Sequence, residues 1–169
     1  GLAVAPGFID PHVHHDEAVL TDPLLACMTS QGVTSVINGN CGFSIAPLKY
    51  QGALPAPLDL IIEEHLPRFE HYRDYRAALE KDPPAVNSAC LIGHGTLRIN
   101  EVQDLSRPAD ARELKAMRAA LDQALSEGGI GLSTGTFYPP ARAATTAELT
   151  AMATVASAHG KLYTTHMRD

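Results

Sequence analysis

An α/β fold with a parallel sheet is the fold class that this sequence predicts, and three observations support it. Short apolar segments alternate with longer segments whose apolar residues recur at helical spacing. Glycine, proline and helix-capping residues separate the two kinds of segment. Polar residues gather directly after the apolar segments, where parallel α/β proteins build their sites. Two architectures satisfy these observations: a doubly wound sheet and a (β/α)8 barrel.

Five segments are short and apolar or β-branched, as buried parallel strands are. They are Gly7–Asp10, Val33–Ile37, Ala89–Gly93, Ile130–Thr134 and Leu162–Thr165. No glycine-rich phosphate motif follows the first of them, which counts against a dinucleotide-binding sheet. A complete barrel takes about 250 residues. The 169 residues of this chain would therefore supply about five of eight barrel units.

Four helical segments are predicted between the strands: 22–32, 58–80, 109–127 and 145–160. Asp22-Pro23 has the form of an N-cap followed by proline at the first helical position. The second segment is interrupted by Pro67. Thr145 and Glu148 have the spacing of a capping box.

Composition excludes several classes of protein. The net charge is −6, and the basic residues form no stripe of the kind that binds nucleic acid. No segment approaches the roughly 20 apolar residues of a membrane span. Three widely spaced cysteines, Cys27, Cys41 and Cys90, do not form a disulfide framework. They indicate a reducing compartment, and we expect the cytoplasm.

His12 and His14 form the sharpest candidate site. They follow the first predicted strand, and residues i and i+2 of an extended chain point to one face. Two imidazoles there could hold one zinc ion. The alternative is that both are ordinary surface histidines. Asp10 would share their face, and we expect a structural task for it.

Further candidates follow the other strands. Cys41 lies in a polar turn after the second strand and is either a thiolate ligand or a small buried apolar residue. His166 follows the fifth strand and would add a third imidazole to the same rim. His94 follows the third strand, and we expect it to orient a ligand or to be structural.

Several blocks of sequence together resemble the N-acyl-D-amino-acid deacylase (D-aminoacylase) family of the amidohydrolase superfamily. The segment 6–14 resembles the opening strand of that superfamily, whose His-x-His pair binds metal. The finer resemblance lies in blocks that appear in family order: 29–34, 39–42, 93–98, 131–140 and 165–168. The resemblance spans nearly the whole chain.

The resemblance implies the first five β/α units of a (β/α)8 barrel, with residues 1–169 as the N-terminal part of the catalytic domain. Cys41 would take the place of the carbamylated lysine that bridges metals in many relatives. With His166 it would hold a tightly bound zinc, and His12 and His14 would contribute to a second, weaker position. Tyr138 resembles a substrate-contacting residue of the family. Arg168 could bind a substrate carboxylate through two hydrogen bonds, and a structural ion pair is the alternative for it.

The resemblance also implies a reaction, the zinc-dependent hydrolysis of N-acyl-D-amino acids to a carboxylate and a free D-amino acid. The catalytic aspartate and another zinc-binding histidine of the family would lie beyond Asp169. We therefore expect the isolated chain to be inactive and to self-associate through its open sheet edges. The alternatives are a hydrolase of cyclic amides related to dihydroorotases and hydantoinases, a non-catalytic metal-binding module, and a purely structural role for the histidines.

Overall fold

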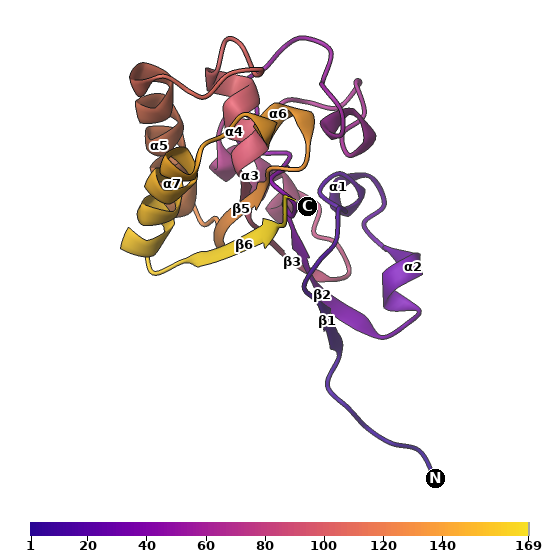
Figure 1. The fold of residues 1–169 in the computed structure, drawn as a ribbon. Coiled ribbons are helices and arrows are strands. Elements are labelled where there is room, and N and C mark those ends of the chain that lie inside the picture. Colours follow the sequence, from indigo (N-terminus) through magenta and orange to yellow (C-terminus); the bar gives the residue numbers. More distant parts are fainter. Residues whose placement is uncertain (169) are drawn as a thin grey trace.

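Strands and helices alternate along the chain in the computed structural model, which describes residues 1–168 (Figure 1). The strands are β1 (Phe8–Asp10), β2 (Val33–Asn38), β3 (Asn87–Cys90), β4 (Ile92–Gly93), β5 (Gly131–Gly135) and β6 (Leu162–His166). The α-helices are α1 (Ala18–Thr21), α2 (Ala26–Thr29), α3 (Tyr72–Lys81), α4 (His94–Glu101), α5 (Ala111–Ser126), α6 (Pro139–Arg142) and α7 (Thr146–Ala158). A short 3-10 helix, η1, spans Leu58–Leu60.

The strands form two three-stranded sheets in which all neighbours are parallel and follow chain order, β1-β2-β3 and β4-β5-β6. Strands β3 and β4 are separated by Leu91 alone, and together they contain the predicted strand Ala89–Gly93. Hydrogen bonds bridge the break, because Leu91 N–H donates to Asn38 O and Ile130 N–H donates to Cys90 O. The predicted parallel α/β class is confirmed, as are all five predicted strand positions.

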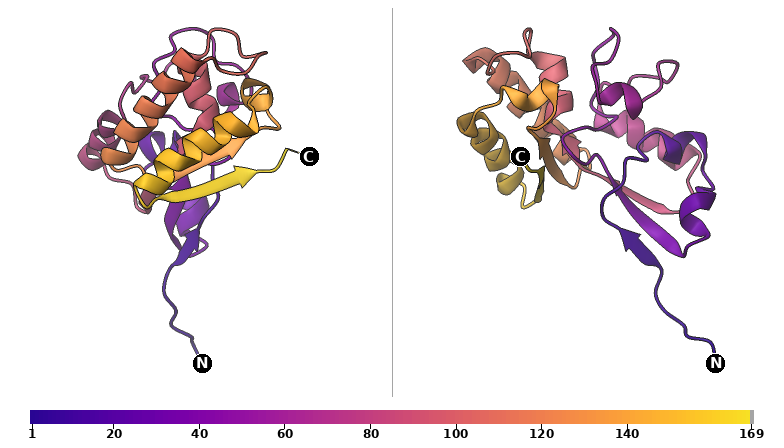
Figure 2. Two further views of the ribbon diagram at one scale, coloured as in Figure 1. Left: turned by 60° about the vertical axis from the view of Figure 1, so that its left-hand side comes forward. Right: turned by 45° about the vertical axis from the view of Figure 1, so that its right-hand side comes forward.

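Helices α4, α5 and α7 cover the second sheet. Helix α5 packs against both α4 and α7, and α7 contacts β5 and β6. Figure 2 shows α7 lying along the strand β6. The predicted apolar face of α5 is buried at Met117, Leu121 and Leu125. In the described part of the chain, no helix has both the length and the apolar character needed to cross a bilayer.

The two outermost strands leave large apolar side chains in contact with solvent. On β1, Phe8 is 62% exposed and Ile9 is 65% exposed. On β6, Leu162 and Tyr163 are about half exposed. Central strand β5 is, by contrast, buried along its whole length. Both ends of the strand order therefore lack the cover that parallel sheets normally have.

The predicted helix 22–32 is wrong in its start and its length. Asp22 is the C-cap of α1 and donates its N–H to Ala18 O. Its backbone lies outside the helical region, as expected for a residue before proline. Leu25 then adopts a left-handed conformation with its side chain buried, and only α2 follows. Burial of Leu25 outweighs the helical pattern of the segment.

The predicted segment 58–80 is helical at its two ends only, in η1 and α3, while the stretch around Pro67 has no regular helix. The capping box at Thr145 is half formed. Thr145 Oγ1 accepts the Glu148 N–H at 3.1 Å, but the Glu148 carboxylate turns inward to a buried ion pair. Helices α4 and α6 were not predicted, because Gly93 passes directly from strand to helix and Pro139–Arg142 is a single turn.

Candidate metal centre

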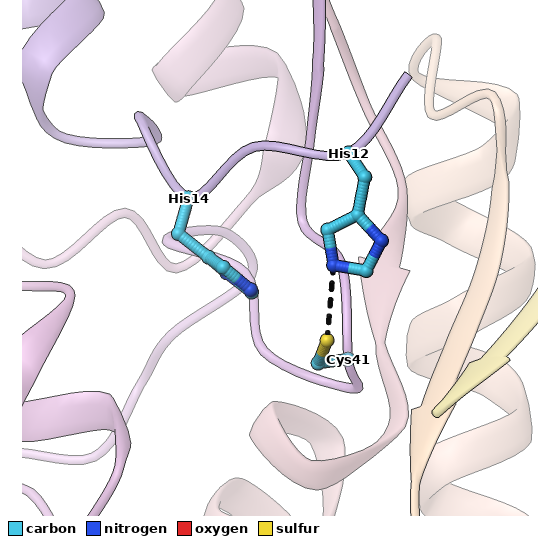
Figure 3. A group of neighbouring side chains, drawn as sticks. All are labelled: His12, His14 and Cys41. Carbon is cyan, nitrogen blue, oxygen red and sulfur yellow. Dashed lines mark hydrogen bonds between the residues drawn. The ribbon is translucent and has the colours of Figure 1, made fainter. Parts of the chain in front are cut away.

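His12 and His14 lie just beyond the end of β1 and point toward the loop that carries Cys41 (Figure 3). The backbone there stays close to a strand, because Val13 N–H donates to Ile37 O of β2. Val13 is buried while both histidines are exposed, so the predicted alternation holds. Asp10 Oδ1 accepts the His12 N–H at 3.1 Å, which is the structural task expected for Asp10.

Cys41 lies in the loop that follows β2 and is buried. Its φ of 55° places it in the left-handed region, which is rare for residues other than glycine. This backbone directs Sγ to within 3.2 Å of His12 Nε2. The ligand atoms of His12, His14 and Cys41 all lie within 4.8 Å of one another.

The loop 39–45 is fixed by side chains from neighbouring elements. The buried Asp16 carboxylate accepts N–H groups at both ends of the loop, from Gly39 at 3.2 Å and from Ile45 at 3.4 Å. Ser133 Oγ, on β5, accepts the Gly42 N–H at 3.0 Å and donates to Gly39 O. These bonds hold the strained conformation of Cys41 in place.

His166, at the end of β6, also lies close to Cys41. Its Nδ1 lies 3.7 Å from Cys41 Sγ and 3.5 Å from the hydroxyl of Tyr138. The rings of Tyr138 and His166 lie 5.1 Å apart. The structure thus groups His12, His14 and Cys41, and it places His166 next to Cys41 and Tyr138.

The donor set fits zinc. With Zn–S near 2.3 Å and Zn–N near 2.0–2.1 Å, tetrahedral ligand atoms are about 3.6 Å apart. The measured Cys41 Sγ distances of 3.2 Å to His12 and 3.7 Å to His166 lie on either side of that value. Two nitrogen donors and one sulfur are typical ligands of this metal.

Local electrostatics favour metal binding at His14. Partial desolvation lowers the pKa of His14, and neighbouring His12 and His15 lower it further, which favours the neutral imidazole whose lone pair can bind a metal ion. Burial raises the pKa of Cys41, and a hydrogen bond with Tyr138 opposes that shift. A bound divalent cation would favour the thiolate and reverse the shift.

His94 lies in a different environment from the four candidate ligands. It is fully buried, and its Nε2 lies 2.8 Å from Glu148 Oε1. Arg98 donates to both oxygens of the same carboxylate at 2.6 and 2.8 Å. Arg98 also donates to Pro140 O at 2.7 Å, which ties this cluster to the helix that begins directly after Tyr138.

Arg168 donates to two backbone carbonyls, Arg142 O at 3.0 Å and Ala144 O at 3.2 Å. Its guanidinium is therefore held at the C-terminal end of α6. These two acceptors are backbone carbonyls, so the hydrogen bonds found for Arg168 are structural but are not the ion pair that was the alternative.

Sequence reasoning missed Asp16, Ser133 and the pair of Arg98 with Glu148. A signal existed for Asp16, because it comes two residues after His14, in the same connection as the histidine pair. Glu148 was assigned to a helix cap, and nothing in the local pattern indicates that Arg98 is buried opposite it. Such long-range pairs depend on the tertiary fold.

Comparison with known proteins places this arrangement in a family. A model of the amidohydrolase family matches residues 1–168. The chain is 51% identical to a D-aminoacylase and 48% identical to an N-acyl-D-aspartate deacylase, both of Alcaligenes xylosoxydans xylosoxydans. Both alignments cover all of this chain and about a third of the relative, 35% and 34%.

Solved structures agree. The D-aminoacylase crystal structure superposes with a TM-score of 0.93 at 50% identity, over 97% of this chain and 34% of that one. The N-acyl-D-glutamate deacylase of Bordetella bronchiseptica, solved with zinc and a phosphonate inhibitor, gives 0.92 at 41% identity with the same coverage. The D-aminoacylase has a binuclear metal centre. With its paired histidines and cysteine at the ends of parallel strands, this chain belongs to the amidohydrolase family.

Proposed function

We propose that the full-length protein to which this chain contributes hydrolyses the amide bond of N-acyl-D-amino acids with zinc. The observation that carries the proposal is the position of Cys41 Sγ, 3.2 Å from His12 Nε2 and 3.7 Å from His166 Nδ1. The relatives named as deacylases of N-acyl-D-amino acids favour this reaction over hydrolysis of cyclic amides.

We also propose that residues 1–169 form the first five units of a (β/α)8 barrel, as the N-terminal part of a catalytic domain. The support is the sequential order of parallel strands and the superposition on about a third of the D-aminoacylase chain. The ligands lie at the carboxyl ends of their strands, where barrel enzymes build their sites.

In this proposal Cys41 and His166 hold a tightly bound zinc, and His12 and His14 provide a second, weaker position. Lewis-acid polarisation of the scissile carbonyl and acidification of a water molecule are the chemistry that bound zinc supplies. Tyr138, whose hydroxyl lies beside His166, orients the substrate. Arg168 would contact a substrate carboxylate only by giving up one of its carbonyl partners.

We assign no general base within the described residues. The carboxylates of Asp10 and Asp16 already accept backbone N–H groups of His12, Gly39 and Ile45. The isolated chain would therefore bind metal without turnover. Its exposed apolar strands β1 and β6 would drive self-association, which sedimentation velocity would detect as species heavier than a monomer.

The proposed location is the cytoplasm. All three cysteines are free thiols, and Cys41 must stay reduced to bind zinc. The proposed partner is a small molecule, the N-acyl amino acid.

The test is zinc content and activity of the full-length protein and of its Cys41→Ser and His166→Ala variants. The exposed Cys27 gives a matched control, Cys27→Ser. We expect near-stoichiometric zinc and hydrolysis of N-acetyl-D-amino acids in the parent and the control, and loss of both in the two site variants. A zinc-loaded parent without activity on any N-acyl amino acid would refute the reaction, and unchanged zinc in the variants would refute the ligand assignment.

A further inference from the structure

A pocket of about 200 Å³ opens beside the candidate metal centre. His14 and Cys41 form one side of it, next to Tyr138. The remaining lining is apolar and comes from Phe43, Pro57, Leu60 and Ile61. A ligand whose reactive group sits at the metal ligands would have this apolar space directly adjacent.

The apolar wall is anchored by the residues that flank it. Leu58 and Ile62 are buried in the core, so the turn η1 leaves Leu60 and Ile61 facing the pocket. Beyond the wall, Glu63 N–H donates to the carboxylate of Glu17 at 2.6 Å, which ties the segment to the connection after β1.

The opposite wall is equally fixed. Phe43 is fully buried and packs edge-to-face on Tyr138, with ring centroids 5.3 Å apart. Phe43 lies two residues after Cys41, in the loop that Asp16 and Ser133 hold. This wall of the pocket is therefore held in a fixed position relative to Cys41.

The charge of the lining decides which part of a substrate fits. Among the described residues that line the pocket, none is a lysine or arginine. A carboxylate placed there would lose hydration without gaining a cation, which is costly. The amino-acid half of an N-acyl amino acid always carries a carboxylate, whereas an alkyl acyl group carries no charge.

We propose that this pocket is the subsite for the acyl group, and that it selects uncharged, apolar acyl chains. The inference rests on the proposed amidohydrolase function and deepens it. In the productive orientation the scissile carbonyl lies at Cys41 and His14, the acyl chain extends toward Leu60 and Ile61, and the amino-acid half extends away from that wall.

The test uses two substrates of equal chain length, N-butyryl and N-succinyl derivatives of one D-amino acid, which differ by a terminal carboxylate. The full-length zinc-loaded protein is compared with Leu60→Arg. Leu60 is 84% exposed, so an arginine there adds a cation without disturbing the core. Leu24, 70% exposed on the surface and absent from the pocket lining, supplies the control Leu24→Arg.

We expect the parent and Leu24→Arg to prefer N-butyryl over N-succinyl substrate in kcat/KM. Leu60→Arg should shift that ratio about fivefold toward N-succinyl, the size expected of a partly exposed ion pair. Its preference between N-acetyl-D-leucine and N-acetyl-D-aspartate should not change. An unchanged acyl ratio with a changed amino-acid preference would overturn the inference, because the pocket would then take the amino-acid side chain. A parent inactive on every N-acyl amino acid would instead refute the proposed function.

Discussion

Two buried carboxylates, Asp16 and Glu148, have different partners and different pKa values. Glu148 faces Arg98 and His94. Burial alone would raise its pKa, but the hydrogen bonds from His94 and Arg98 outweigh burial and lower the pKa to about 2. Asp16 has only backbone N–H groups and the Cys90 thiol as donors. Burial raises the pKa of Asp16 to about 6.

Glu148 is part of a structural ion pair, whereas Asp16 positions the loop that carries Cys41. A carboxylate with a buried arginine is a stable ion pair, and this one joins α4 to α6 and α7. A buried carboxylate without a cation reduces stability when ionised, so its retention requires another reason. Asp16 binds both ends of the loop 39–45, and Cys41 lies between those ends.

Breaking the ion pair of Arg98 and Glu148 should have the largest effect on stability. Glu148→Gln would leave Arg98 buried without a counter-charge, and we expect a loss of about 3–5 kcal/mol of unfolding free energy. Thermal or urea unfolding of the full-length protein measures it. A double variant, Arg98→Met with Glu148→Leu, should recover part of the loss. If Glu148→Gln is as stable as the parent, the Arg98–Glu148 ion pair does not stabilise the fold.

Acid should weaken the same ion pair, because it protonates Glu148. The folded pKa of Glu148 is about 2 against an ordinary value of 4.5, so the ionised pair stabilises the fold above pH 4.5. That contribution, on the order of 3 kcal/mol, should be lost as pH falls from about 4.5 toward 2. Unfolding free energy measured across this range should fall less steeply in Glu148→Gln. The raised pKa of Asp16 acts in the opposite sense, disfavouring the fold as pH rises from about 4 to 6.

Changing Asp16 should act on metal binding as well as on stability. In Asp16→Asn one of the N–H groups of Gly39 and Ile45 would face an amide NH2, which costs about 1–3 kcal/mol. Because the loop carries Cys41, zinc affinity should fall about 10- to 100-fold, as for other residues that orient a ligand. Competition with a chelator measures the affinity. Asp104→Asn, an exposed carboxylate that caps a turn, is the control, and parental zinc affinity in Asp16→Asn would remove Asp16 from the positioning role.

Exposed ion pairs should contribute least. Arg76 and Glu80, four residues apart on α3, are both well exposed. Arg76→Ala should change the unfolding free energy by about 0.3–0.5 kcal/mol. A loss as large as that of Glu148→Gln would show that burial does not explain the difference between the pairs.

Local patterns were sufficient for the strands, and they placed His12, His14, Cys41 and His166 at strand ends, where the structure also has them. The orientation of Cys41 could not, because its left-handed backbone depends on Asp16 and Ser133, which come from other elements. Helix 22–32 failed for a related reason. The segment 22–32 has apolar residues at helical spacing, but Leu25 is buried in the core in a left-handed conformation, which interrupts the helix.

The most direct test of the account is X-ray absorption spectroscopy at the zinc edge on the full-length protein and its Cys41→Ser variant. We predict a zinc–sulfur shell at about 2.3 Å in the parent, with imidazole nitrogens at about 2.0–2.1 Å. The sulfur shell should be absent from Cys41→Ser, whereas Cys27→Ser should match the parent. A parental spectrum with only nitrogen and oxygen neighbours would contradict the claim that Cys41 is the central ligand of this site.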